Sequence, residues 1–128
     1  MKKYGFSKAT AYGGSHGGFL STHLIGQYPN FYSAASVRNP VTHLETMLGL
    51  SDIPDWTINE ALGKYDYKFG QMATPELYSL LHEHSPTKYI DQVKTPILFM
   101  VGKVDLRVPP SQSMIYFKAL SARNVPTK

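Results

Sequence analysis

The sequence contains no cysteine. This absence excludes disulfides, a thiol nucleophile and zinc sites built on cysteine. No stretch approaches the roughly 20 consecutive apolar residues that a membrane-spanning helix needs. The basic start of the chain also lacks the apolar run of a secretory signal. We therefore expect no membrane association and a cytoplasmic location.

Concentrated charge is lacking as well. The 13 lysines and arginines exceed the nine aspartates and glutamates, which gives a formal net charge of +4. The cations are scattered along the chain, without the dense basic run or the signature motif of a nucleic-acid-binding protein. We therefore expect no nucleic-acid partner. The 128 residues, 42% of them hydrophobic, suffice for one domain with a sizeable core.

Hydrophobic patterns broken by glycine and proline predict alternating strands and helices. Short apolar runs predict strands over 8–12, 32–37 and 96–101, and the approach to a further strand over 125–128. Helical spacing predicts helices over 19–28, 76–83 and 111–120, with short helices and loops over 41–71. This order of elements predicts an α/β fold with parallel strands joined by right-handed crossovers.

Two of these segments have a distinctive apolar pattern. The run over 96–101 is continuously apolar, as in strands that are buried on both faces of a parallel sheet. In the helix over 19–28, the residues Leu20, Leu24 and Ile25 share one face.

A glycine-rich motif lies between the first strand and the first helix. Gly13-Gly14-Ser15-His16-Gly17 fits the pattern G-x-S-x-G of a strained turn that exposes a nucleophilic serine. Side chains two residues before and after the serine are expected to collide with neighbouring structure, so glycines stand there. The helix would direct its first N–H groups at the serine oxygen, with the N–H of His16 as one oxyanion donor. The ring of His16 is not expected to reach Ser15, and a glycine-rich turn without a catalytic role is the alternative.

The carboxylate of a Ser-Asp-His triad is expected just after a later strand, at its carboxyl end. Asp105 follows the run over 96–101 and is therefore the candidate for the triad acid. The alternative is a solvated loop aspartate that caps the next helix.

The triad histidine should follow the acid, yet residues 106–128 contain no histidine. Without a base, Ser15 keeps its proton and is a poor nucleophile at neutral pH. The segment His82-Glu83-His84 does not have metal-binding spacing, because residues i and i+2 of a helix point apart. We therefore expect surface histidines there, no metal site and no cofactor.

Eight segments together resemble the catalytic domain of acylaminoacyl-peptidases, in the prolyl oligopeptidase family of serine peptidases. They are Gly-Gly-Ser-His-Gly-Gly-Phe at 13–19, His-Leu-Ile-Gly-Gln-Tyr-Pro at 23–29, Arg-Asn-Pro-Val at 38–41, Asp-Ile-Pro-Asp-Trp at 52–56, Ser-Pro at 85–86, Val-Lys-Thr-Pro at 93–96, Asp-Leu-Arg-Val-Pro at 105–109 and Ala-Leu-Ser-Ala-Arg-Asn-Val-Pro at 119–126. The resemblance implies an α/β-hydrolase fold and release of an N-acylated amino acid from the blocked N-terminus of peptides, in enzymes that often form homo-oligomers.

The resemblance also implies roles for five residues. Ser15 matches the nucleophile, His16 the oxyanion position and Asp105 the triad acid. Arg107 matches an arginine that holds a carbonyl of the bound peptide, a task that suits a guanidinium fork, although an ordinary surface ion pair is the alternative. Trp56 matches an aromatic wall of the specificity pocket, with a core or lid tryptophan as the alternative.

The chain departs from the family where the triad histidine, the upstream strands and the second oxyanion donor would be. We therefore expect residues 1–128 to form a partial α/β-hydrolase catalytic domain, without the last helix and strand, that has little or no activity alone. Two other functions stay open. One is a non-catalytic truncated isoform that binds the full-length enzyme or acyl-peptides. The other is a carboxylesterase or lipase-like hydrolase, since these enzymes share G-x-S-x-G.

Overall fold

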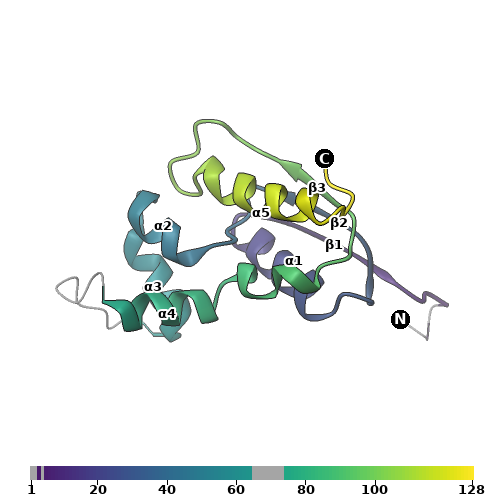
Figure 1. Cartoon of the computed structure of the whole chain (residues 1–128), viewed down its shortest axis with the longest axis horizontal. Helices are drawn as coiled ribbons and strands as arrows, with labels where there is room; N and C mark the ends of the chain where they lie inside the picture. Colours follow the sequence, from purple (N-terminus) through teal and green to yellow (C-terminus); the bar gives the residue numbers. More distant parts are fainter. Residues whose placement is uncertain (1–2, 4, 65–73) are drawn as a thin grey trace.

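The computed structural model of the chain describes residue 3, residues 5–64 and residues 74–128. A parallel sheet of three strands forms its centre, in the order β1 (Ala9–Gly14), β2 (Tyr32–Arg38) and β3 (Ile97–Met100) (Figure 1). All three predicted strands are confirmed, with ends that differ by one or two residues. The predicted approach to a further strand is confirmed too, because Thr127 forms a parallel bridge with Ile97 at the free edge of β3.

Helices fill the connections between these strands. They are α1 (His16–Gln27), α2 (Leu44–Leu50), α3 (Pro54–Leu62), α4 (Pro75–Glu83) and α5 (Pro110–Ala122), with the 3-10 helix η3 (Pro86–Gln92) before β3. The sequence patterns anticipated α1, α4 and α5, and the expected mixture of short helices and loops is seen as far as residue 64. The rest of that segment, up to residue 71, lies outside the described residues. No pattern pointed to η3, which begins at a proline and buries only Pro86.

The helices that contact the sheet pack on one of its faces. Register places Ala11, Ala35 and Ile97 side by side, and these residues share a core cluster with Ile25 of α1 and with α5. In Figure 1, α5 crosses in front of the sheet.

The opposite face of the sheet carries Tyr12 and Leu98, which are 74% and 41% exposed. Strand β3 is therefore not buried on both faces, and that prediction was wrong for this chain. A continuous apolar run shows that both faces of a strand can pack against apolar residues. Whether both faces are buried depends on which neighbouring segments are present.

Helix α1 buries a different face from the one that its leucines suggested. Leu20 and Leu24 are 49% and 38% exposed, whereas Ile25 is fully buried. The buried positions also include Gly18, Phe19 and Thr22. A Cβ at Gly18 would lie 2.7 Å from Pro40, so the glycine lets the helix approach the segment after β2 closely. The face that carries the leucines is therefore not the face that is most buried.

A second core lies beside the sheet, between α2, α3 and α4. Leu44, Met47, Ile58 and Leu81 are its most buried members, and Phe19 of α1 joins them. Prolines begin both α3 and α4, where a missing N–H costs nothing. None of the helices within the described residues is long and apolar enough to span a membrane.

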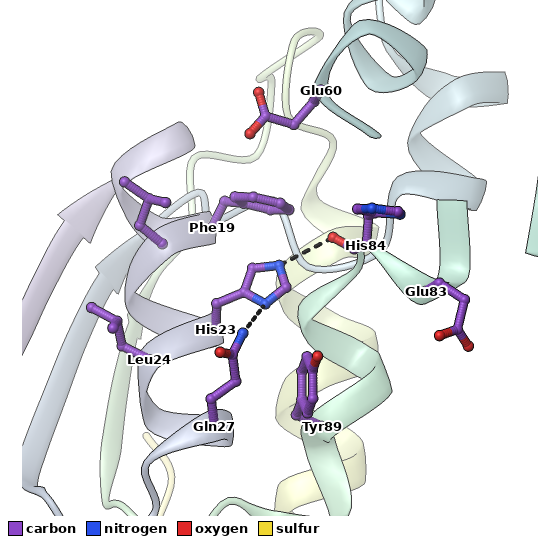
Figure 2. A pocket seen from close by; sticks show the side chains of 9 residues that line it. Phe19, His23, Leu24, Gln27, Glu60, Glu83, His84 and Tyr89 are labelled. Atoms are coloured by element: carbon purple, nitrogen blue, oxygen red, sulfur yellow. Dashed lines mark hydrogen bonds between the residues drawn. The ribbon is translucent and has the colours of Figure 1, made fainter. Parts of the chain in front are cut away.

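A pocket of about 570 Å³ opens between α1, α3 and the end of α4, with His23 on its floor (Figure 2). His23 Nε2 lies 3.1 Å from the carbonyl oxygen of His84, and its Nδ1 lies 3.2 Å from Nε2 of Gln27. A neutral ring with its proton on Nε2 satisfies both contacts. Burial lowers the pKa of His23, the nearby His84 ring acts in the same direction, and Glu60 and the bond to the His84 carbonyl oppose them.

The turn after β1 depends on two close approaches of backbone. A Cβ at Gly13 would overlap the carbonyl group of Gly17, and one at Gly18 would lie 2.7 Å from Pro40. A Cβ at Gly17 would meet no described atom within 4 Å. Crowding was therefore predicted correctly before the serine, whereas after it the crowded position is Gly18 rather than Gly17.

Gly13→Ala should destabilise the fold by about 3 kcal/mol, since the added methyl group overlaps backbone that cannot move aside. Gly17→Ala is the matched control, because it adds the same group to the same turn in open space within a helix. It should change the free energy of unfolding by less than about 1 kcal/mol, toward stabilisation. Urea denaturation of both variants measures the difference, and equal effects would contradict the packing described for Gly13.

Lowering the pH should destabilise the chain through His23. In the unfolded chain His23 takes up a proton near its ordinary pKa of about 6.5, but in the folded chain it does so only at lower pH. The loss of stability therefore begins as the pH falls below about 6.5 and is complete below the folded-state pKa. His23→Gln should flatten this dependence. His84→Gln, which keeps the His84 carbonyl that His23 contacts, should retain it.

Candidate active site

Ser15 occupies the single residue between β1 and α1. Its backbone has φ 54° and ψ −122°, a conformation that residues other than glycine rarely adopt. Two backbone hydrogen bonds hold Ser15 in this strained conformation. The N–H of Ser15 donates to the carbonyl oxygen of Arg38 at 2.9 Å, and its carbonyl oxygen accepts from the N–H of Phe19 at 3.0 Å. The side chain is exposed at the tip of this bend, as the motif predicted.

Helix α1 begins at His16, directly after the serine. The N–H groups in the first turn of a helix have no acceptor within the helix, and the helix dipole makes this end positive. The backbone of His16 therefore lies where an oxyanion formed next to Ser15 would be stabilised. Its ring points elsewhere, because Nε2 lies 2.9 Å from Glu60 Oε1 and the ring stacks on Phe19.

Asp105 lies in the loop between β3 and α5, and its carboxylate is held by three donors. Oδ1 accepts from the backbone N–H groups of Arg107 and Val108 at 3.0 and 2.9 Å. Oδ2 accepts from Asn39 Nδ2 at 2.5 Å. Asp105 is therefore fixed by its own loop and by the end of β2, and it does not cap α5, whose N-cap is Pro109.

Ser15 and Asp105 line one pocket of about 460 Å³ at the carboxyl ends of the strands. The remaining lining residues are Arg38, Asn39, Met100, Val101 and Gly102. The structure thus brings together the two residues that the motif and the position after β3 singled out. Asn39 is the member that sequence reasoning missed, although its place directly after β2 put it at the same edge.

None of the five histidines, all of which are described, lines this pocket. His43 and His82 both contact the Glu45 carboxylate. His43 Nδ1 lies 3.4 Å from Oε2, and His82 Nδ1 lies 2.8 Å from Oε1. His84 Nδ1 contacts the carbonyl oxygen of Leu80. Within residues 3, 5–64 and 74–128, no three histidine, aspartate or glutamate side chains are grouped as a metal ion would require.

Arg107 forms a bidentate ion pair with Asp52. Its Nε lies 3.2 Å from Oδ1 and its Nη2 lies 3.1 Å from Oδ2. Hydrogen bonds from Arg107 lower the pKa of the Asp52 carboxyl, and the same pairing raises the pKa of Arg107. Ser51 also donates to the carbonyl oxygen of Arg107 at 2.7 Å, so this segment ties the loop after β3 to the α2–α3 connection.

A second, smaller cavity of about 90 Å³ lies beside Ser15 and His16. Its other lining residues are Val41, Met47, Ile53, Trp56, Arg107 and Val108. The indole of Trp56 meets the His16 ring edge-on at 5.7 Å. Trp56 and Arg107 therefore line the same small cavity as Ser15.

This arrangement supplies most of what acyl transfer to a serine needs. It has a strained, exposed hydroxyl, a helix N-terminus for the developing oxyanion and a carboxylate to orient a base. Within the described pocket the base itself is lacking, because no imidazole lies between Ser15 and Asp105.

Comparison with known proteins shows which family and which proteins this chain resembles. The family model described as "Prolyl oligopeptidase family" matches residues 4–128. The acylamino-acid-releasing enzyme of Sus scrofa is 51% identical over 116 residues, which are 91% of this chain and 16% of that protein. The enzyme of the same name from Arabidopsis thaliana is 47% identical over 122 residues, covering 95% and 16%. The chain thus spans about a sixth of the length of these relatives.

Solved structures show the same fold. The acylaminoacyl peptidase of Pyrococcus horikoshii superimposes with a TM-score of 0.75 at 22% identity, over 94% of this chain and 18% of that one. A puromycin-hydrolyzing peptidase of Mycobacterium tuberculosis gives 0.74 at 23% identity, over 92% and 17%. Since the family model matches almost the whole chain and the relatives are about half identical to it, the chain belongs to the prolyl oligopeptidase family of serine peptidases.

Proposed function

We propose that Ser15 is the nucleophile of a peptidase that releases N-acylated amino acids from blocked peptides. The observation that supports this most is that Ser15, in a strained backbone conformation at the start of α1, shares a pocket with the tethered carboxylate of Asp105. The name of the relatives that are about half identical supports the substrate class. The fold alone would suit an ester equally well.

In the proposed reaction, Ser15 Oγ attacks the carbonyl carbon of the acylated residue. Negative charge then develops on the carbonyl oxygen, toward which the first N–H groups of α1 are directed. Collapse of the tetrahedral intermediate expels the peptide amine, which receives the proton that the base took from Ser15. The acyl-enzyme left on Ser15 is then hydrolysed by water. Asp105 would orient the base that takes the Ser15 proton and stabilise the charged form of that base.

The base is the part of the proposal that this sequence does not supply. His16 is the histidine nearest to Ser15 in the chain, and its Nε2 is engaged by Glu60. We infer that activity needs an imidazole from a longer polypeptide that contains these residues. Alone, the 128-residue chain would then have little or no turnover.

Trp56 and Arg107 are proposed to hold the acylated residue. A cavity of about 90 Å³ admits an alanine-sized side chain more readily than an aromatic one, and its walls at Val41, Met47 and Trp56 are apolar. The ion pair with Asp52 fixes the orientation of the Arg107 guanidinium. The N–H groups of Arg107 that Asp52 does not use remain available for a substrate carbonyl.

A non-catalytic role is the second candidate, because no histidine lines the pocket and the sheet has an uncovered face. A product of this kind would bind the full-length enzyme through β1, whose outer edge is unpaired within the described residues. Co-purification of the chain with that enzyme would support it, whereas a monodisperse monomer without affinity for the enzyme would exclude it.

The catalytic proposal is best tested in a chimeric protein. The matching 116-residue segment of the Sus scrofa enzyme is replaced by the segment from this chain, and hydrolysis of acetyl-alanine p-nitroanilide is measured. The chimera should be active, and Ser15→Ala should reduce kcat by about a thousandfold or more. The 128-residue chain alone should not exceed its own Ser15→Ala background. Robust, Ser15-dependent turnover by that chain would show that the base lies within it.

Enlarging the small cavity should change the preferred residue. In the same chimera, Trp56→Ala should raise the ratio of kcat/KM for acetyl-phenylalanine over acetyl-alanine anilide by about tenfold. Tyr28→Ala removes an exposed aromatic side chain at the end of α1 and should leave the ratio unchanged. An unchanged ratio in Trp56→Ala would place the specificity pocket elsewhere.

A further inference from the structure

Asn39 joins the ends of two strands beside the proposed active site. It follows β2 directly, and its N–H donates to the carbonyl oxygen of Met100 at the end of β3, at 3.0 Å. Its backbone has φ 41°, which asparagine tolerates better than most residues. Although most of the loop after β3 is exposed, Asn39 itself is only 8% exposed. A polar side chain buried here must find its partners within the site.

Both ends of the Asn39 amide are used by the loop after β3. Its Oδ1 accepts from the N–H of Gly102 at 2.7 Å, and its Nδ2 donates to Asp105 Oδ2 at 2.5 Å. The two bonds also settle which end of the amide is oxygen, since a backbone N–H cannot donate to Nδ2. Gly102 leaves the necessary room, because a Cβ there would lie 3.2 Å from Asn39 Nδ2.

We propose that Asn39 is a positioning residue for Asp105, an inference that rests on the proposed function of Ser15. An ionised carboxylate offers about four acceptor sites. Arg107 and Val108 fill those of Oδ1, and Asn39 fills one on Oδ2. The remaining site on Oδ2 is the one left for the N–H of the catalytic base. Asn39 thus fixes the direction from which an imidazole can be bound.

The atom of residue 39 that faces Asp105 Oδ2 has to be a hydrogen-bond donor. Asn39→Asp would keep the shape and the acceptor for Gly102, but it would place a second carboxylate oxygen against Asp105 Oδ2. Two carboxyl groups this close share a proton, so that one of them titrates at higher pH. Asn39→Gly would remove the side chain while relieving the positive φ. Side-chain and backbone effects can therefore be separated.

The test is kinetic and uses the chimera described above, with acetyl-alanine p-nitroanilide as substrate. Asn39→Ala and Asn39→Gly should both lower kcat by about ten- to a hundredfold, the range for losing a hydrogen bond to a charged group, with KM changed less than twofold. Asn39→Asp should move the acid limb of the kcat/KM profile to higher pH by at least about one unit. Asn124→Ala is the matched control. Asn124 also has positive φ, at 60°, but it follows α5 outside the pocket, so its loss should leave kcat and the pH profile unchanged.

A double-variant cycle separates positioning from a general structural effect. In the Asp105→Asn background, Asn39→Ala should cause no further loss of kcat, because a residue that acts through the Asp105 carboxylate has nothing left to orient. The inference about Asn39 would be overturned if the kcat losses of the two single variants multiply in the double variant, or if the Asn39 variants keep the parent's kcat and pH profile. The proposed function of Ser15 would stand in both cases. A chimera whose hydrolysis survives Ser15→Ala and Asp105→Asn, or that shows none to begin with, would overturn the proposed function and this inference with it.

Discussion

The register of the parallel sheet is the constraint on which the site depends. Gly14, Arg38 and Met100 lie side by side at the ends of their strands. The chain leaves all three strands at the same edge, so the loops that follow begin next to one another. Backbone hydrogen bonds extend this alignment by one residue, from Ser15 to Arg38 and from Asn39 to Met100. The serine, the amide and the carboxylate meet because the strands end together.

Much of this arrangement was predictable, because its signals are local. The turn needs a glycine at position 13 for steric reasons, and the serine two residues later is then exposed by the geometry of the bend. The position of Asp105 followed from one rule about the ends of parallel strands, applied to the most apolar run of the sequence.

What escaped prediction depends on partners that are distant in the sequence. The Arg-Asn-Pro-Val segment carried the resemblance, but nothing in it showed that Asn39 would reach Asp105, 66 residues away. The bond of Arg107 to Asp52 spans 55 residues and was likewise invisible. The sequence also did not show which face of α1 is buried, for a related reason. Leu20 and Leu24 fit the expected periodicity, but glycines and Thr22 decided which face of α1 meets the sheet. The spacing of large apolar residues does not report how closely two backbones can approach.

The backbone angle at Ser15 has a consequence for how this sequence would respond to laboratory evolution. A residue other than glycine in such a conformation costs on the order of 1–3 kcal/mol. Glycine at position 15 would remove most of that penalty and with it the hydroxyl group. Libraries of variants that are selected only for thermal stability should therefore accumulate glycine at this site. A serine that is retained after such selection would indicate that the screen had also selected for catalytic activity.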